Sequence, residues 1–372
     1  MRITRKVRAL APYVHGEQPR GSRIIKINTN EAAYPPSRKV MAELGRIDSD
    51  SLRLYSDASC TELCKALAKL NGTKPENVFV GNGSDEILSL MTDAFVEDNE
   101  AIGSLDPSYS LYKVLAAIRG VKWVSLGDPC AKRLPAKTGK VALALITNPN
   151  NPTGTMIAPR EIAAFAKRFR GVVVVDEAYV HYAPANCMKL ATSPRNRNVI
   201  VMRTFSKAYS LAGLRVGYCV GPKDLIAALY KIKDSYNVDA IAQQLALAAV
   251  RDQKGLKATV KKVLATRKWF TAALENRGWD VLESAANFIF ARPPVEWGSI
   301  SPERSELRSR RYAGCRLAAS KTAERVFTKL RERNIFIRYF RGPMTGDRVR
   351  ISIGTDAQMK RVLREVDDIL GE

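Results

Sequence analysis

The sequence predicts an α/β fold with a mostly parallel central sheet, helices on both faces of that sheet, and a smaller α+β domain at the C-terminal end. Between residues 78 and 230, short apolar runs alternate with amphipathic stretches, which is the pattern of repeated strand and helix units. After residue 276 the pattern changes to short strands with two helices, one among them and one at the end. At 372 residues the chain is longer than one ordinary core requires, so about two domains are expected.

The first 34 residues predict an arm that stands apart from the core. They are basic at first, then rich in turn formers, with one short extended run at 24–28. Pro35 and Pro36 prevent a helix from beginning before residue 37. We therefore expect an arm at 1–34, a large domain at 35–262 and a small C-terminal domain at 263–372.

The apolar spacing predicts the elements of both domains in order. The strands expected in the large domain are 78–80, 101–104, 121–125, 141–147, 172–175, 199–204 and 216–220. Its helices are expected at 37–45, 60–70, 87–95, 109–118, 159–168 and 224–230. A helical stretch at 241–276, with a possible break at 251–256, leads to the small domain, where we expect strands 279–283, 288–291, 335–339 and 348–353 and helices 322–333 and 356–370. Residues 293–321 have weak periodicity and high charge, which predicts a long loop or insertion.

The composition excludes several classes of protein. Hydrophobic residues make up 46% and charged residues 26%, as in globular proteins, and no run of about 18 apolar residues predicts a membrane span. The first residues lack the apolar core of a secretory signal, so the cytoplasm is the expected compartment. Six cysteines without paired spacing and only two histidines argue against a metal site, so the cysteines are interpreted as reduced thiols. His15 and His181 are interpreted as surface or packing residues.

The formal net charge of +23 is the unusual feature of the composition. Such an excess is compatible with a nucleic-acid partner or with attraction of anionic substrates. The basic residues are spread along the chain, and no zinc finger, RNA-recognition motif or basic heptad region is present. A diffuse positive surface is therefore favoured over nucleic-acid binding, which stays open as the alternative from another class.

Lys207 is the central candidate residue. It follows the predicted strand 199–204 and lies among Phe205, Ala208 and Tyr209, in a segment that otherwise reads as interior. A buried amine loses hydration, so its neutral form is favoured and it becomes a nucleophile toward a carbonyl. Hydroxyls at Thr204 and Ser206, with the guanidinium of Arg215, would suit a phosphate. A lysine beside a phosphate site suggests pyridoxal phosphate.

Other polar residues follow the neighbouring predicted strands, whose carboxyl ends share one edge of the sheet. Asp176 and Tyr179 follow four valines, in the run VVVVDEAY, and a carboxylate there could face a cationic pyridinium nitrogen. Asn151 lies in the turn NPNNPTG, where its amide could hold the phenolic oxygen of the cofactor, as could Tyr179.

Two further motifs complete the candidate site. Ser84 and Asp85 lie in GNGSDE between a strand and a helix, where free N–H groups and the helix dipole form an anion site. Tyr109, in DPSY, could stack on the pyridine ring. Each motif alone also fits an ordinary turn or helix start, but chance does not readily explain all of them together.

The set GNGSDE, DPSY, NPNNPTG, DEAY and TFSKAYSLAGLR resembles the fold-type I aminotransferases over nearly the whole chain. Residues 204–213 match the class II signature around the lysine that binds the cofactor. The resemblance implies pyridoxal 5'-phosphate as cofactor, Lys207, Asp176 and Tyr179 as catalytic residues, and Asn151 as the residue that holds the phenolic oxygen. The residues assigned to the cofactor in this way are Ser84, Asp85, Tyr109, Asn151, Asp176, Tyr179, Thr204, Ser206, Lys207 and Arg215.

The N-terminal runs VRALAPYVHGEQ, IKINTNEAAYPPS and LRLYSD are similar to those of the histidinol-phosphate aminotransferases, although Ala32 and Ala33 replace the usual Asn-Pro. This resemblance implies a homodimer in which Tyr55 reaches the partner's cofactor phosphate. It places Tyr13, Arg338 and Arg350 on the substrate side with Asn151. A guanidinium accepts either the carboxylate of glutamate or the phosphate of histidinol phosphate, so one pocket can serve both substrates.

The implied reaction interconverts L-histidinol phosphate and 2-oxoglutarate with imidazole-acetol phosphate and glutamate. Lys207 would bind the cofactor and then move a proton at the substrate's alpha carbon. Two enzyme alternatives of the same fold remain, a threonine-phosphate decarboxylase and an aromatic or broad-range aminotransferase.

Overall fold

The central sheet of the protein has seven strands and runs almost entirely parallel. The computed structural model describes residues 2–10, 15–21, 23–294 and 307–371. The strand order is β2-β8-β7-β6-β5-β3-β4, and β8 is antiparallel to both of its neighbours while the other pairs are parallel. The strands are β2 Val78–Gly81, β3 Ala101–Ser104, β4 Lys122–Ser125, β5 Val141–Thr147, β6 Val172–Asp176, β7 Val199–Thr204 and β8 Gly217–Val220. The predicted fold class is confirmed.

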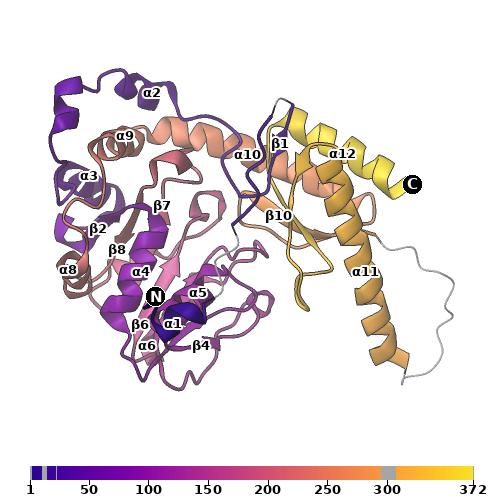
Figure 1. Cartoon of the computed structure of the whole chain (residues 1–372), viewed down its shortest axis with the longest axis horizontal. Helices are drawn as coiled ribbons and strands as arrows, with labels where there is room; N and C mark the ends of the chain where they lie inside the picture. The colour runs from indigo at the N-terminus through magenta and orange to yellow at the C-terminus, as the bar shows by residue number, and fades with distance from the viewer. Residues whose placement is uncertain (1, 11–14, 22, 295–306, 372) are drawn as a thin grey trace.

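Except at the edge strand β4, whose residues are mostly exposed, the sheet is buried on both faces, and successive residues of a strand enter different cores. Val173 and Val175 of β6 belong to one hydrophobic cluster and Val174 to the other. The cluster with Val174 is closed by α4 Gly83–Phe95, α5 Leu111–Arg119 and α8 Lys223–Ile232. The other cluster is closed by α3 Thr61–Asn71, α6 Pro159–Arg168, α7 Met188–Ala191 and α9 Ala240–Arg251. Helix α2 Arg38–Leu44 packs on α9 (Figure 1).

The C-terminal region has its own antiparallel sheet, of order β12-β13-β10-β9. Its strands are β9 Asp280–Val281, β10 Phe288–Arg292, β12 Arg338–Tyr339 and β13 Val349–Ser352, and its helices are α11 Leu307–Glu332 and α12 Asp356–Gly371. The long helix α10 Gln253–Glu275 runs from α9 toward this region (Figure 1). The expected boundary at residues 262–263 lies within α10, and the division into domains stays a prediction.

The N-terminal arm joins the C-terminal region through backbone hydrogen bonds. Its strand β1 Ile25–Lys26 pairs in parallel with β11 Ile335–Phe336, so the arm is anchored beside the second sheet. The remaining short elements are α1 Arg5–Arg8, η1 Ser49–Arg53, η2 Pro75–Asn77, η3 Pro129–Ala131, η4 Val180–Tyr182 and η5 Ala212–Leu214.

The prediction of a loop at residues 293–321 is wrong in part. Residues 293–321 were expected to be a loop or insertion, but α11 begins at Leu307 and continues without a break to Glu332. The stretch from Leu307 onward lacks a clear apolar stripe, yet arginine, alanine, leucine and lysine dominate it, and these residues favour a helix without periodicity. Residues 295–306 lie outside the described part of the chain.

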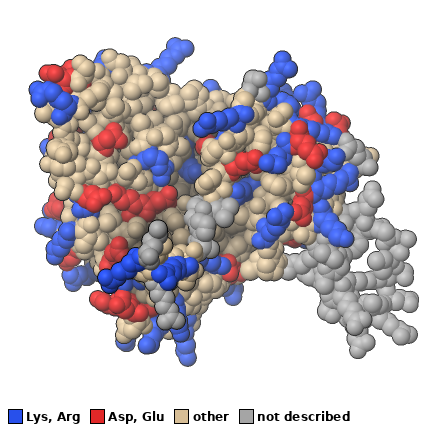
Figure 2. Space-filling view, viewed as in Figure 1, with Lys and Arg blue, Asp and Glu red and all other residues tan. Residues whose placement is uncertain are grey.

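Two surface properties bear on the partners of the protein. None of the helices among the described residues is long and apolar enough to cross a membrane. Figure 2 shows lysine and arginine side chains scattered over both halves of the visible face, with acidic side chains among them, and no single basic stripe. On that face the excess positive charge is diffuse.

Candidate active site

A cavity of about 700 Å³ opens where the parallel strands of the central sheet end. Thr147 of β5, Asp176 of β6 and Thr204 of β7 each line it from the last position of a strand. Its other wall comes from the arm and from the C-terminal region. The predicted site residues that line this one cavity are Ser84, Asp85, Tyr109, Asn151, Asp176, Tyr179, Thr204, Ser206, Lys207, Arg215, Arg338 and Arg350.

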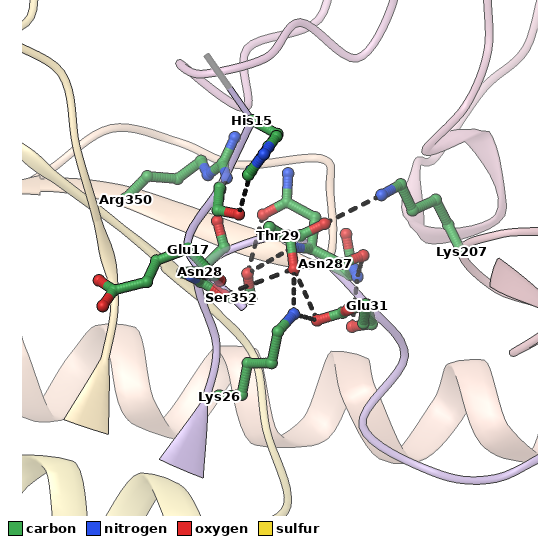
Figure 3. Close-up of polar contacts among 12 residues, drawn as sticks. His15, Glu17, Lys26, Asn28, Thr29, Glu31, Lys207, Asn287, Arg350 and Ser352 are labelled. Atoms are coloured by element: carbon green, nitrogen blue, oxygen red, sulfur yellow. Dashed lines mark hydrogen bonds and ion pairs between the residues drawn. The ribbon is translucent and has the colours of Figure 1, made fainter. Parts of the chain in front are cut away.

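Lys207 extends into the cavity from the loop after β7. Its Nζ donates a hydrogen bond to the carbonyl of Thr29 at 3.1 Å and lies 5.8 Å from the ring centroid of Tyr179 (Figure 3). Burial, and next the positive charge of Arg350, lowers the pKa of the Lys207 amine to about 8. The amine is therefore much closer to its neutral, nucleophilic form at pH 7 than an exposed lysine is.

Asp176 is a buried carboxyl without a cationic partner at ion-pair distance among the described residues. Burial raises its pKa to about 6, and a hydrogen bond from Tyr112 opposes that rise. Tyr112 donates its hydroxyl to Oδ2 of Asp176 at 2.7 Å, and the N–H of Ala178 donates to Oδ1 at 3.1 Å. A protonated ring nitrogen placed at this carboxyl would supply the missing positive charge.

The N-terminus of α4 and two hydroxyls form a cradle for a phosphate. Gly83 begins the helix at φ +80°, and a Cβ there would lie 2.6 Å from Nη2 of Arg215. Arg215 also contacts Oγ of Ser206 at 3.4 Å, and Thr204 donates to the same Oγ at 3.0 Å. Free helix N–H groups, hydroxyls and a guanidinium thus surround one space that a side chain at residue 83 would fill.

Between the lysine and this cradle lie the groups that could contact an aromatic ring. The hydroxyl of Tyr109 donates to Asp85 at 3.2 Å, and the hydroxyl of Tyr179 accepts from Nδ2 of Asn30 at 3.0 Å. An amine of lowered pKa, a buried carboxyl and a phosphate cradle in one cavity are what pyridoxal phosphate requires. The described residues therefore fit this cofactor.

Arg350 lies on the side of the cavity formed by the second sheet. Its Nη1 donates to Oδ1 of Asn151 at 2.5 Å and its Nη2 to the carbonyl of Asn28 at 2.6 Å. Its guanidinium lies 5.2 Å from the ring centroid of Phe340 and 5.5 Å from that of Phe288. These contacts fix the guanidinium in place, so it can receive an anionic group without first being ordered.

Arg338 lies at the mouth of the cavity, beside the arm. Its Nη1 donates to the carbonyl of His15 at 3.4 Å, and its guanidinium lies 5.3 Å from the ring centroid of Phe340. Two arginines from the second sheet therefore line the same cavity as Lys207.

The segment at 28–31 also forms part of the site, although it was not among the predicted site residues. Figure 3 shows Asn28, Thr29 and Glu31 between Arg350 on one side and Lys207 on the other. Asn30, at φ +56°, exchanges hydrogen bonds with Ser352, and its carbonyl accepts from Asn287. The polar run NTNE directly after an apolar extended stretch was the signal that could have indicated this role.

Tyr112 was also missed. It is completely buried, and its hydroxyl lies 2.6 Å from Thr147 Oγ1 as well as bonding to Asp176. Its position three residues after Tyr109 puts both rings on one face of the helix start, where they meet edge to face. That spacing was visible in the sequence.

Two predicted residues are not among the described lining of this cavity, for different reasons. Tyr13 lies outside the described residues. Tyr55 is 83% exposed and stacks on Tyr236 with ring centroids 4.3 Å apart, away from the cavity of its own chain. Tyr55 therefore does not take part in the cavity of its own chain.

Comparisons with known proteins agree with this geometry. Residues 22–366 match the family model described as aminotransferase class I and II. The chain is 39% identical to a histidinol-phosphate aminotransferase of Syntrophotalea carbinolica, with 99% of each chain covered. It is 37% identical to histidinol-phosphate aminotransferase 1 of a Nostoc species, covering 98% of this chain and 97% of the relative. The crystal structure of a Sinorhizobium meliloti histidinol-phosphate aminotransferase in complex with pyridoxal-5'-phosphate superimposes with a TM-score of 0.85, at 25% identity over 100% of this chain and 98% of the other.

Proposed function

The chain belongs to the class I and II aminotransferases, and we propose that it exchanges the amino group of L-histidinol phosphate with the oxo group of 2-oxoglutarate in histidine biosynthesis. The observation that carries the proposal is one cavity that contains a half-buried lysine of lowered pKa, a buried aspartate and two arginines from the second sheet. The products are imidazole-acetol phosphate and glutamate.

Pyridoxal phosphate is the cofactor of this family, and when bound it supplies an electron-withdrawing ring that stabilises negative charge at the substrate's alpha carbon. Lys207 would hold its aldehyde and Asp176 its ring nitrogen, with Tyr179 and Asn151 at the phenolic oxygen and Tyr109 at the ring. Ser84, Asp85, Thr204, Ser206 and Arg215 would hold its phosphate.

Lys207 is the proposed proton carrier. Its pKa of about 8 leaves a substantial neutral fraction near neutral pH, so Nζ can take the proton from the substrate's alpha carbon and return it. The carbonyl of Thr29 accepts a hydrogen bond from Nζ of Lys207 at 3.1 Å, which keeps the lysine side chain directed into the cavity.

Arg350 and Arg338 are the proposed substrate anchors, together with Tyr13 and Asn151. Both arginines carry their charge at any pH of interest and present forked donors to a carboxylate or a phosphate. A pocket with this chemistry can bind the phosphate of histidinol phosphate in one half of the reaction and a carboxylate of glutamate in the other.

We further propose a cytoplasmic homodimer in which Tyr55 completes the partner's phosphate site. The exposed stack of Tyr55 on Tyr236 supports this arrangement, because a large aromatic surface left in water favours association.

The test is a product analysis with purified, cofactor-loaded protein. Histidinol phosphate with 2-oxoglutarate should yield glutamate, and the Lys207→Ala variant should yield none and lack the absorbance of the lysine-bound cofactor. Threonine phosphate is the competing substrate, and carbon dioxide released from it at a higher rate would indicate the decarboxylase instead. Faster turnover of aromatic amino acids would indicate the broad-range enzyme, and cofactor-independent, salt-sensitive nucleic-acid binding without turnover would indicate a binding protein.

A further inference from the structure

A second cavity, of about 850 Å³, lies outside the active site and shares no lining residue with it. Its walls come from both parts of the molecule. The region around the central sheet contributes residues 131–133 at the end of η3, Met156, residues 158–161 at the start of α6, and residues 182–185. The other wall consists of Leu264 and Arg267 on α10 and residues 283–285 between β9 and β10.

The cavity is lined by more basic than acidic side chains. Lys132, Arg133, Arg160 and Arg267 line it, against Glu161 and Glu283. Lys132 pairs with Glu283 at 3.0 Å and Arg160 with Glu161 at 3.6 Å. Among the described residues no carboxylate lies within ion-pair distance of Arg133 or Arg267, so two guanidinium groups remain without an acidic partner.

Arg267 is the inner cation of the two. It is half-buried, and its Nη1 donates to the carbonyl of Ala286. Burial lowers the pKa of its guanidinium, although an arginine keeps its charge at physiological pH. A charge withdrawn from water without a counter-ion is costly, and an anion in the cavity would offset that cost.

We propose that this cavity is a regulatory site for a small dianion, bound by Arg267 from within and by Arg133 at the rim. Guanidinium groups present paired donors, which match the paired oxygens of a phosphate group or a carboxylate. The ligand is therefore a phosphate-bearing or a dicarboxylic metabolite.

The cavity is connected to the active site through one short turn. The N–H of Ala285, in the cavity wall, donates to the carbonyl of Gly154 at 2.8 Å. Gly154 closes the turn that carries Asn151, whose Oδ1 accepts from Arg350. A ligand that joins the two walls would hold this turn against the second sheet. Motion of such turns commonly accompanies substrate entry and product release, so a ligand that restrains this turn would lower kcat.

Calorimetric titration of the cofactor-loaded protein tests the binding, with inorganic phosphate and succinate as separate probes. The active site also binds anions, so the wild type should show two binding events for the preferred probe. The Arg267→Met variant should lose one event, and Arg133→Met should weaken that event about tenfold, as expected for a charged hydrogen bond. Arg170→Met removes an exposed cation outside the cavity and should match the wild type.

Arg133 is exposed, so Arg133→Met should fold normally. It therefore tests the binding site even if Arg267→Met does not fold. A single binding event for both probes, or two events that persist unchanged in Arg133→Met, would overturn the proposal. The titration needs no turnover, so its result stands whether or not the proposed transamination does.

Steady-state rates at saturating substrate test the regulation. The bound anion should lower kcat in the wild type and in Arg170→Met, and saturating substrate should not relieve the effect. The effect should disappear in Arg267→Met. An inhibition that saturating substrate fully relieves would place the anion in the active site and contradict the regulatory role.

Discussion

At the scale of single residues, the chemistry depends on how burial shifts the pKa values of two ionisable groups. Lys207 and Asp176 line one cavity, and burial favours the neutral form of each, lowering the pKa of the amine and raising that of the carboxyl. The cofactor-free protein thus holds a nucleophile near its neutral form and a carboxyl that lacks a counter-charge. Each property predicts a measurable response.

Cofactor capture by the apoprotein should depend on pH with a midpoint near 8. Only the neutral amine of Lys207 attacks the aldehyde, so the rate should rise about tenfold per pH unit below the pKa and level off above it. The charge of Arg350 contributes to the lowered pKa, so Arg350→Met should move the midpoint upward. Stopped-flow absorbance measures both curves.

The matched control for this experiment is Arg348→Met. Arg348 pairs with Asp280 at 2.6 Å and does not line the cavity, so its loss should leave the midpoint unchanged. A wild-type midpoint near 10, the value of an exposed lysine, would contradict the buried amine.

Tyr112→Phe should weaken cofactor binding about tenfold or more. The change removes a hydrogen bond to a buried carboxylate, which is among the stronger bonds in proteins. It also raises the pKa of Asp176, because that bond favours the ionised form, so the acid limb of the activity profile should move to higher pH. A spectroscopic titration of the cofactor and a pH profile of kcat measure these effects.

Tyr230→Phe is the control for Tyr112→Phe. It deletes a hydroxyl that donates to the carbonyl of Val78 and does not line the cavity. Equal cofactor affinities in the two variants would show that the hydroxyl of Tyr112 does not position Asp176.

At the scale of elements, the start of α4 determines whether a phosphate can bind. Gly83→Ala places a side chain at φ +80° and 2.6 Å from the guanidinium of Arg215. We expect the free energy of unfolding to fall by about 1 kcal/mol from the backbone conformation, and cofactor affinity to fall about tenfold or more from the displaced guanidinium. Chemical denaturation and cofactor titration separate the two effects.

Gly72→Ala provides the matched control. Gly72 ends α3 at φ +65°, and a Cβ there would meet no heavy atom within 4 Å. This variant should show a similar loss of stability with unchanged cofactor affinity. An equal fall in affinity for both glycine variants would exclude a specific role for the α4 cradle.

The same scale shows what the sequence could and could not predict. The bounds of β5, α6 and β7 were predicted correctly, because each is a strongly patterned run with clear ends. Lys207 and Asp176 were found because they follow such strands. The pairing of Ile25 with Ile335 had no local signal, since it depends on how the chain folds back on itself. The polar run NTNE marks Thr29 and Asn30 as candidate site residues, but their place in the cavity depends on the same folding back of the chain.

At the scale of the whole molecule, the charge of +23 leaves no concentrated basic surface on the visible face (Figure 2). A diffuse positive field still raises the local concentration of anionic substrates around the protein. We therefore expect kcat/KM for histidinol phosphate to fall as ionic strength rises, while kcat changes little. Salt screens the long-range attraction that brings the substrate to the protein, but it has little effect on the substrate once bound. A kcat/KM independent of salt would contradict electrostatic steering.

Mixing two weakened variants tests the proposed dimer. If Tyr55 serves the partner's site, a mixed dimer of Lys207→Ala and Tyr55→Ala has one site with both residues intact. Random exchange of subunits puts such a site in half of the dimers, so activity should recover to about a quarter of the wild-type value.

The exposed position of Tyr55, away from the cavity of its own chain, is the reason to expect recovery. If Tyr55 acted within its own subunit, every subunit in the mixture would lack one of the two residues, so no dimer would contain an intact site and activity would stay at the mean of the two variants. Rates measured before and after denaturant-induced subunit exchange, with each variant alone treated identically, distinguish these outcomes.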